Sequence, residues 1–288
     1  YGDFHPYVYK TADAGKTWKA IQNNLPERGT AYSIAEDHVD ANLLFVGTEF
    51  GVFFTNDGGQ KWIQLKGGLP TIAVRDLEIQ RRENDLVLAT FGRGFYVLDD
   101  YTALRQAKKE AIEKPAAIFP VKDAWMYIQS TPLGVRGKGF QGESFFTTPN
   151  PKPGAVFTYY LKEDIKTIKE KRQEAEAAKI KKGETVTYPS IDSLRLEDQQ
   201  PAPHLLFTVT DEQGNTVRRI KAPAKKGLKR ISWDFRTAPF GPVDLTPFDE
   251  SFVFSSPDIG YMALPGNYKV SLSKFEDGEY TDLVAPQS

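Results

Sequence analysis

The chain contains no cysteine among its 288 residues and only three histidines. A disulfide, a zinc–thiolate centre and a cysteine nucleophile are therefore excluded within it. The histidines, His5, His38 and His204, stand far apart in the sequence and lack the spacing of metal ligands. No phosphate-binding glycine loop and no nucleophile elbow occurs either. We therefore expect no metal site and no cofactor.

The sequence also lacks an excess of charge of either sign and any long apolar run. Its 37 Lys and Arg residues nearly balance 38 Asp and Glu residues, for a net charge of −1. No global field favours nucleic acid or an anionic membrane. Because no apolar run approaches the ~18 residues of a membrane-spanning helix, we expect no direct membrane insertion.

What the sequence does contain is one pattern in two copies. Residues 11–18 read Thr-Ala-Asp-Ala-Gly-Lys-Thr-Trp, and residues 55–62 read Thr-Asn-Asp-Gly-Gly-Gln-Lys-Trp. A Leu-Pro pair follows each copy at the same distance, and the offset between copies is 44 residues, from Thr11 to Thr55. A period of about 40–45 residues suits one four-stranded blade of a β-propeller.

The repeated pattern predicts a hairpin turn rather than a chemical site. Its aspartate can accept hydrogen bonds from backbone N–H groups of the turn, and its glycine suits a positive φ. Its tryptophan opens the outer strand and can bury a large ring between hairpins. Calcium binding is not expected, because the loop lacks a ladder of alternating oxygen ligands. The residues with these structural roles are Asp13, Gly15, Trp18, Asp57, Gly59 and Trp62.

The pattern resembles the Asp-box of sialidase-type and sortilin-type β-propellers. On that basis residues 1–100 are expected to form the last blades of an incomplete propeller. The final blade lacks an Asp-box, as expected of a closing repeat, so the missing blades should lie upstream and the chain should be an internal or C-terminal fragment. The expected strands are 31–36, 43–47, 51–55 and 61–65, then 74–80, 86–90 and 94–98.

Residues 101–116 are expected to form a helical linker, with one helix over 101–113 that ends before Pro115. Residues 117–288 read as a β-sandwich of the immunoglobulin or fibronectin type. It would carry a Gly/Pro-rich loop at 130–154 and a charged helical insertion at 162–182, which is either solvated or a docking helix for a partner. The predicted fold class is all-β. The strands expected in the sandwich are 117–119, 124–128, 155–161, 205–210, 216–221, 227–235, 251–254, 266–274 and 280–284.

Two further stretches carry a family resemblance. The sandwich sequence around Trp233 and 264–270 resembles the small β-sandwich of flagellar hook-capping proteins, a module found in secreted bacterial proteins. The final blade, with Thr-Phe-Gly-Arg-Gly-Phe at 90–95, resembles the propeller end of large exported bacterial proteins labelled glycosyl hydrolases. This implies an extracellular, cell-surface or periplasmic location and upstream propeller blades as partners. The chain departs from the family at Phe91, where members often carry histidine.

In an antiparallel blade the Asp-box turns lie on one face of the propeller, and the turns between the second and third strands lie on the other. This second face, which we call the loop face, commonly carries ligands. Three interpretations stay open for Glu49 and Arg93, which occupy equivalent turns: a structural ion pair, ligand contact or catalysis. The candidate ligand-binding residues on the loop face are Glu49, Phe50, Arg75, Phe91 and Arg93.

The sequence offers no catalytic residue that can be assigned. A glycosidase needs two paired carboxylates, and nothing in the sequence pairs Glu49 with Asp76 or Asp99. We therefore predict a binding or assembly module for protein, peptide or glycan. The alternatives are the C-terminal part of a sialidase-like or xyloglucanase-like glycoside hydrolase with its catalytic acids on upstream blades, and a purely structural tail.

Overall fold

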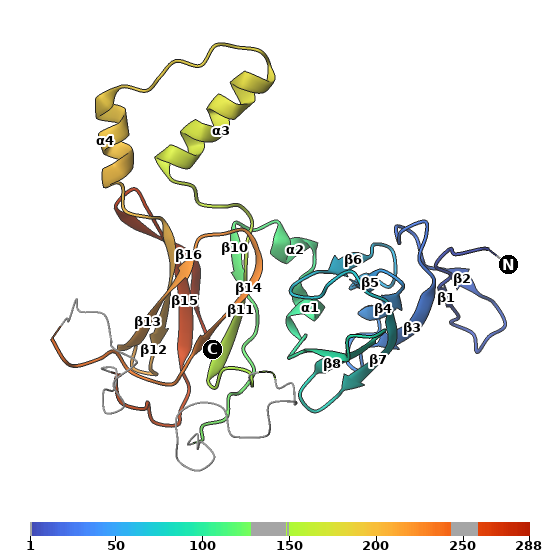
Figure 1. Ribbon diagram of the computed structural model, residues 1–288. Coiled ribbons are helices and arrows are strands. Elements are labelled where there is room, and N and C mark those ends of the chain that lie inside the picture. The colour runs from blue at the N-terminus through green and yellow to red at the C-terminus, as the bar shows by residue number, and fades with distance from the viewer. Residues whose placement is uncertain (1, 128–147, 149, 243–258) are drawn as a thin grey trace, which may run out of the picture. The chain divides into compact units, whose positions relative to one another are not determined.

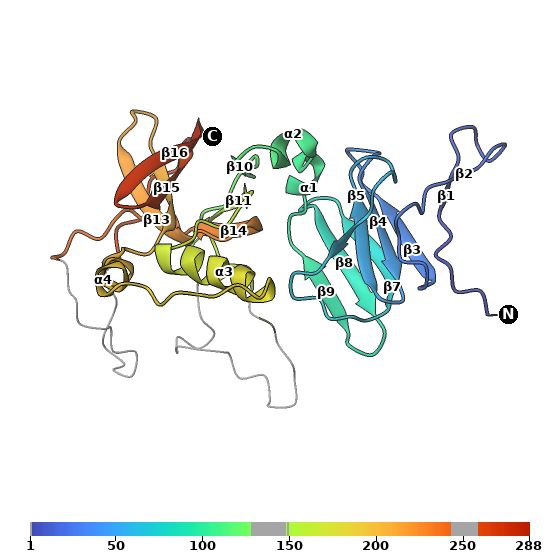
Figure 2. The ribbon, with the colours of Figure 1, turned by 90° about the horizontal axis from the view of Figure 1, so that it is seen from above.

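The computed structural model describes residues 2–127, 148, 150–242 and 259–288. The chain divides into two compact units, Tyr1–Ala111 and Ile112–Ser288, which we call unit 1 and unit 2. Both are built from antiparallel sheets, as Figures 1 and 2 show, so the predicted all-β class is confirmed. None of the helices in the described ranges has the length and apolar character needed to cross a membrane.

Unit 1 contains the propeller blades. A hairpin of β1 (Tyr9–Lys10) and β2 (Lys19–Ala20) precedes them. The innermost strands of the two blades, β3 and β7, lie next to each other. The first blade has strand order β3 (Ala31–Glu36), β4 (Leu44–Thr48), β5 (Gly51–Thr55) and β6 (Ile63–Leu65), and the second has β7 (Val74–Gln80), β8 (Asp85–Thr90) and β9 (Phe95–Leu98).

Burial in unit 1 follows from blade-on-blade packing. Every residue of β4 and β5 is buried, because these central strands are covered on both faces. One face packs on the second blade through Phe45 and Val52, which share a core cluster with Leu77 and Leu86. The other face packs on the first hairpin through residues that include Phe53 and Trp62.

The second copy of the repeated pattern, residues 55–62, forms a turn closed by its own side chains; we keep the name Asp-box for both copies because of the resemblance. Asp57 accepts hydrogen bonds from Thr55 Oγ1 at 2.6 Å and from the backbone N–H of Lys61 at 3.0 Å. Gly59 has φ +92°, and a Cβ there would lie 2.8 Å from the Cβ of Ile21. Trp62 is only 3% exposed and donates its indole N–H to the carbonyl of Ile21 at 2.7 Å. The turn therefore fastens the first hairpin to the following blade.

The first Asp-box closes in the same way, but its tryptophan is not buried. Asp13 accepts from Thr17 Oγ1 at 2.6 Å and from Thr17 N at 2.8 Å. These bonds hold the pKa of Asp13 at about 2. Trp18 is 62% exposed and donates its indole N–H to Gly15 in its own turn. The prediction of a buried ring is wrong for Trp18. The first hairpin covers Trp62, whereas no described hairpin packs on Trp18 in the same way.

The segment after β9 closes unit 1 and is not one helix. It forms two four-residue helices, α1 (Ala103–Gln106) and α2 (Lys109–Ile112), where we expected a single helix over 101–113. Tyr101 and Leu104 are buried in the blade core, and the ring of Tyr101 meets Phe45 edge-on at 5.1 Å. Because Tyr101 and Leu104 are buried in this core, the segment does not continue as the single helix that the sequence predicted.

A buried ionic cluster at the Asp-box end of unit 1 holds this segment in place. The side chain of Asp37 is fully buried, and Arg105 donates to both of its carboxylate oxygens at 2.8 and 2.7 Å. Tyr101 adds a bond at 2.7 Å, and Arg105 also donates to Asn84. Burial alone would raise the pKa of Asp37, but the bonds from Arg105 and Tyr101 outweigh it and hold the pKa at about 2.

Unit 2 is a sandwich of two sheets. Their facing side chains form one core, in which Phe207 contacts Phe157 and meets Tyr159 edge-on at 4.9 Å. The three-stranded sheet has order β10 (Ala116–Ile118), β11 (Ala155–Leu161), β14 (Gly227–Trp233), and the four-stranded sheet has order β13 (Thr216–Pro223), β12 (His204–Thr210), β15 (Lys269–Glu276), β16 (Glu279–Gln287).

The insertion between β11 and β12 differs from its prediction. It holds two helices, α3 (Ile168–Lys181) and α4 (Ile191–Gln199), which stand at one end of the sandwich in Figure 1. The predicted helix over 162–182 starts too early, because Thr167 and Glu170 form a capping box that sets its first turn. Helix α4 was not predicted.

Three further expectations concern residues near the undescribed segments. Residues 124–127 contain no strand, because this stretch finds no partner in either sheet. The loop expected at 130–154 falls mostly outside the described residues. The strand expected at 251–254 lies entirely outside them.

Replacing Trp62 by alanine should lower the free energy of unfolding of unit 1 by about 3–5 kcal/mol, because it leaves a cavity between the hairpin and the blade. Trp18→Ala is the matched control, since the same residue in the same pattern is exposed, and its effect should stay within about 0.5 kcal/mol. Denaturant unfolding followed by tryptophan fluorescence and circular dichroism measures both. Equal effects would contradict the packing described here.

The Asp37–Arg105 pair should make unit 1 sensitive to acid. Because the folded pKa of Asp37 lies below its unfolded value, its contribution is complete above about pH 4 and disappears as the pH falls toward 2. Arg105→Met should cost about 3–5 kcal/mol at neutral pH and flatten this pH dependence. Arg82→Met removes an exposed pair with Glu83 and should change neither. An unaltered pH profile in Arg105→Met would contradict the assignment.

Candidate functional site

The loop face of unit 1 is formed by turns that hydrogen-bond to one another. The β4–β5 turn is tied to the chain entering β3, since Glu49 N donates to Thr30 O at 3.1 Å. The β8–β9 turn is tied to the connection between blades, since Phe91 N donates to Ala73 O at 2.9 Å. The Asp-box turns lie at the other end of the strands, where Gly58 N donates to Asn42 O. The expected separation of the two faces is therefore present.

Two aromatic rings on the loop face are open to solvent. Phe50 is 42% exposed and Phe91 is 68% exposed. The ring of Phe50 rests against Gly29, where an added Cβ would come within 2.9 Å of it. Gly29 has φ +128°, so glycine is required there both by backbone conformation and by space. The chain thus uses a glycine to seat an exposed aromatic side chain.

Arg75 lies beside Phe91 and Tyr32. Its guanidinium carbon is 4.0 Å from the ring centroid of Tyr32 and 5.4 Å from that of Phe91. These are cation–π distances, and they join a residue of β3, a residue of β7 and a residue of the β8–β9 turn. Arg75 and Phe91 were predicted as candidate binding residues, but Tyr32 was not, because its only signal in the sequence was its place in the innermost strand.

Glu49 and Arg93 do not form the structural ion pair considered above. Among the described residues, no ion pair or hydrogen bond engages either side chain. Glu49 is half-buried and Arg93 is exposed. Both therefore remain available on the loop face, one acidic and one basic.

A shallow cavity of about 620 Å³ near the N-terminus involves the chain next to the loop face, since Phe4 O accepts from Gly29 N. Asp3 accepts hydrogen bonds from Tyr7 Oη at 2.7 Å and pairs with His5 Nδ1 at 2.8 Å. These contacts hold the pKa of Asp3 at about 2. His5 is isolated from the other histidines in the sequence, and the alternation of Asp3, His5 and Tyr7, which brings their side chains together, was not predicted.

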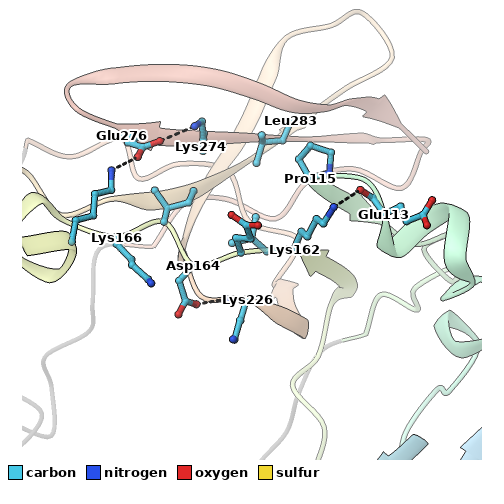
Figure 3. Close-up of a pocket in the computed structure, with 13 residues that line it drawn as sticks. Glu113, Pro115, Lys162, Asp164, Lys166, Lys226, Lys274, Glu276 and Leu283 are labelled. Carbon is cyan, nitrogen blue, oxygen red and sulfur yellow. Dashed lines mark hydrogen bonds and ion pairs between the residues drawn. The ribbon is translucent and has the colours of Figure 1, made fainter. Parts of the chain in front are cut away.

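Unit 2 has a second cavity, of about 690 Å³, at the base of the α3–α4 insertion (Figure 3). Its lysines are largely engaged: Lys171 and Lys274 pair with Glu276 at 3.2 and 2.7 Å, and Lys162 donates to the carbonyl of Glu113. Asp164 accepts from Lys226 N at 2.6 Å. These contacts tie the insertion to the sandwich. The charged side chains that line the cavity therefore have a structural role. No group of three or more His, Asp or Glu in the described parts of the chain could hold a metal ion.

A double-mutant cycle tests whether Glu49 and Arg93 are independent. Glu49→Ala and Arg93→Ala should each change the free energy of unfolding by less than about 0.5 kcal/mol, because neither side chain has a partner to lose. Their effects should add within about 0.3–0.5 kcal/mol. Chemical denaturation of the four variants measures this, and a larger coupling energy would restore the ion-pair interpretation.

Comparisons with known proteins identify no family for this chain. No protein-family model matches it, and no curated protein matches it. Among solved structures it is similar to the extracellular domain of BT4673 from B. thetaiotaomicron, described once as a one component system and once as a hybrid two component system. Each has 12% identity and a TM-score of 0.28, and the matches cover 96% and 98% of this chain.

The chain is also similar to PorZ, a surface component of the type-IX secretion system of Porphyromonas gingivalis, at 12% identity and a TM-score of 0.23 over 94% of this chain. It spans only 27% and 28% of the BT4673 chains and 30% of the PorZ chain. At these scores the similarities carry no argument about this protein.

Proposed function

We propose that this chain is the C-terminal part of an exported bacterial propeller protein and acts as a binding and assembly module for protein, peptide or glycan. Its location would be the cell surface or the periplasm, as the family resemblance of the final blade implies. The observation that carries the proposal is the loop face, where Phe50 and Phe91 are exposed and Glu49, Arg75 and Arg93 carry no ionic partner among the described residues. Exposed rings beside unpaired polar groups are typical of recognition surfaces.

Upstream blades of the same protein are the first partner in this proposal. Two blades cannot close a propeller, which typically has about four to eight. The outer face of the second blade leaves Phe95 76% exposed and Val97 53% exposed. The corresponding strand of the first blade, β5, is buried throughout. A further blade packed on β9 would remove these apolar side chains from water.

The α3–α4 insertion supports an assembly role in unit 2. Arg172 of α3 donates to both carboxylate oxygens of Glu197 in α4, at 2.6 and 2.8 Å, so the two helices are held together. Ile180 is 66% exposed and Ile191 is 70% exposed. Apolar side chains presented on a braced pair of helices suit a docking role better than a merely solvated one.

The alternative, the C-terminal part of a glycoside hydrolase, places the catalytic acids on upstream blades. No observation on the described residues favours it. It would be favoured by paired carboxylates on the loop face of those blades and by release of reducing sugar from polysaccharide by the intact protein.

Binding to saccharide and peptide arrays tests the proposal. The chain should bind a subset of probes, and Phe50→Ala/Phe91→Ala should abolish that binding, because it removes both exposed rings of the loop face. Trp18→Ala is the matched control, since it removes an exposed ring from the Asp-box end. Absence of binding to every probe, or equal binding by both variants, would contradict a loop-face site.

A further inference from the structure

The innermost strands of the two blades carry a β-bulge at the same place. The pairing register of β3 on β4 skips Tyr32, and that of β7 on β8 skips Arg75. Both bulges occur at the first pairs of the strand, next to the loop face. A bulge redirects the side chain of the extra residue and often occurs beside a functional site. The repeat therefore turns one side chain per blade toward its neighbour at this end of the strands.

The two redirected side chains meet each other. The guanidinium of Arg75 lies over the ring of Tyr32, with Phe91 on the adjacent turn as a second ring. The N–H groups of a guanidinium lie in the plane of the group and can donate to an acceptor beside the ring. Because the rings restrict the long side chain, less conformational entropy remains to be lost when those N–H groups bind something.

Nothing in the described chain binds those N–H groups. Arg75 is exposed, and within the described residues no carboxylate or carbonyl accepts a hydrogen bond from its side chain. This distinguishes it from Arg105 and Arg172, whose guanidinium groups bind carboxylates. An arginine oriented by two aromatic contacts but left without an acceptor is arranged for an external anion.

We propose that Arg75 is the anion-binding residue of the loop face and that its ligand is an acidic saccharide. The guanidinium would bind a carboxylate or sulfate group through two parallel hydrogen bonds, while the sugar ring packs on Phe91. A saccharide is favoured because the guanidinium carbon and the Phe91 centroid are 5.4 Å apart, so a single ring bearing an anionic group reaches both. This inference rests on the proposed loop-face binding and specifies its ligand class.

Calorimetry with the complete 288-residue chain tests the inference. The probes are an oligogalacturonate for the carboxylate source, a sulfated galactan oligosaccharide for the sulfate source, and a neutral galactose oligomer. At least one acidic saccharide should bind, the neutral oligomer should bind about tenfold more weakly or not at all, and added salt should weaken binding. Arg75→Gln should lower the affinity for the acidic saccharide by about tenfold or more.

Two further variants separate recognition from folding. Arg75→Lys keeps the charge and the contact with Tyr32 but loses the two-pronged geometry, so its affinity should fall between those of the wild type and Arg75→Gln. Arg81→Gln, at the opposite end of β7, is the matched control and should bind as the wild type does. Unchanged melting temperatures by circular dichroism show that each variant is folded.

Three outcomes overturn the inference. Equal affinity of Arg75→Gln and wild type would exclude Arg75 as the anion-binding residue. Equal binding of the neutral oligomer would exclude an anionic ligand. An oligoglutamate peptide that binds more tightly than both acidic saccharides, with the same dependence on Arg75, would assign the site to acidic peptides instead.

If Phe50→Ala/Phe91→Ala abolishes array binding while Arg75→Gln changes nothing, only this inference fails. If no probe binds at all, the proposed function fails with it.

Discussion

The first blade of unit 1 satisfies one constraint on which the rest of the unit depends: both faces of its sheet are covered by neighbouring elements. The central strands β4 and β5 meet it, since each of their residues is buried between the second blade and the first hairpin. Trp62 fills the joint on one side, and Tyr101 fills the space beside Phe45 on the other. The buried Asp37–Arg105 pair then fixes the segment that follows the last strand, because a buried carboxylate without its cation would be strongly unfavourable.

The two ends of unit 1 differ in how their side chains are used. At the Asp-box end, the carboxylates of Asp37 and Asp57 accept hydrogen bonds from arginine, threonine and backbone N–H groups. At the loop face the turns are also tied by backbone bonds, but their side chains are left outside. Phe50 and Phe91 are exposed on these turns, and Arg75 is exposed at the start of β7. A rigid scaffold with open side chains at one end is how loops carry binding function.

The sequence predicted the strands of unit 1 closely, because the alternation of buried and exposed residues and the repeat spacing are local signals. The strands at 31–36, 51–55 and 74–80 have their predicted bounds. Features set by distant contacts were missed. Trp18 and Trp62 occupy the same position of the repeated pattern, yet among the described residues a hairpin covers Trp62 and none covers Trp18 in the same way.

The candidate site shows the same limit. The sequence predicted one linker helix over 101–113, whereas Tyr101 and Leu104 of this stretch are core residues of unit 1. The contact between Tyr32 and Arg75 depends on two β-bulges, whose extra residues cannot be identified without the register of the neighbouring strands. The presence of a loop face with Arg75 and Phe91 was predictable, whereas their pairing was not. The contact between Arg75 and its aromatic neighbours can therefore be identified only from the packing of the two adjacent blades.

Hydrogen–deuterium exchange with and without an acidic oligosaccharide tests the central claim, that the loop face binds ligand while the Asp-box end is structural. Peptides that contain residues 29–32, 71–75 and 90–94 should exchange more slowly when ligand is bound. The Asp-box turns at 11–18 and 55–62 should not change. Protection confined to the Asp-box turns, or to the lysine-lined cavity of unit 2, would contradict the account.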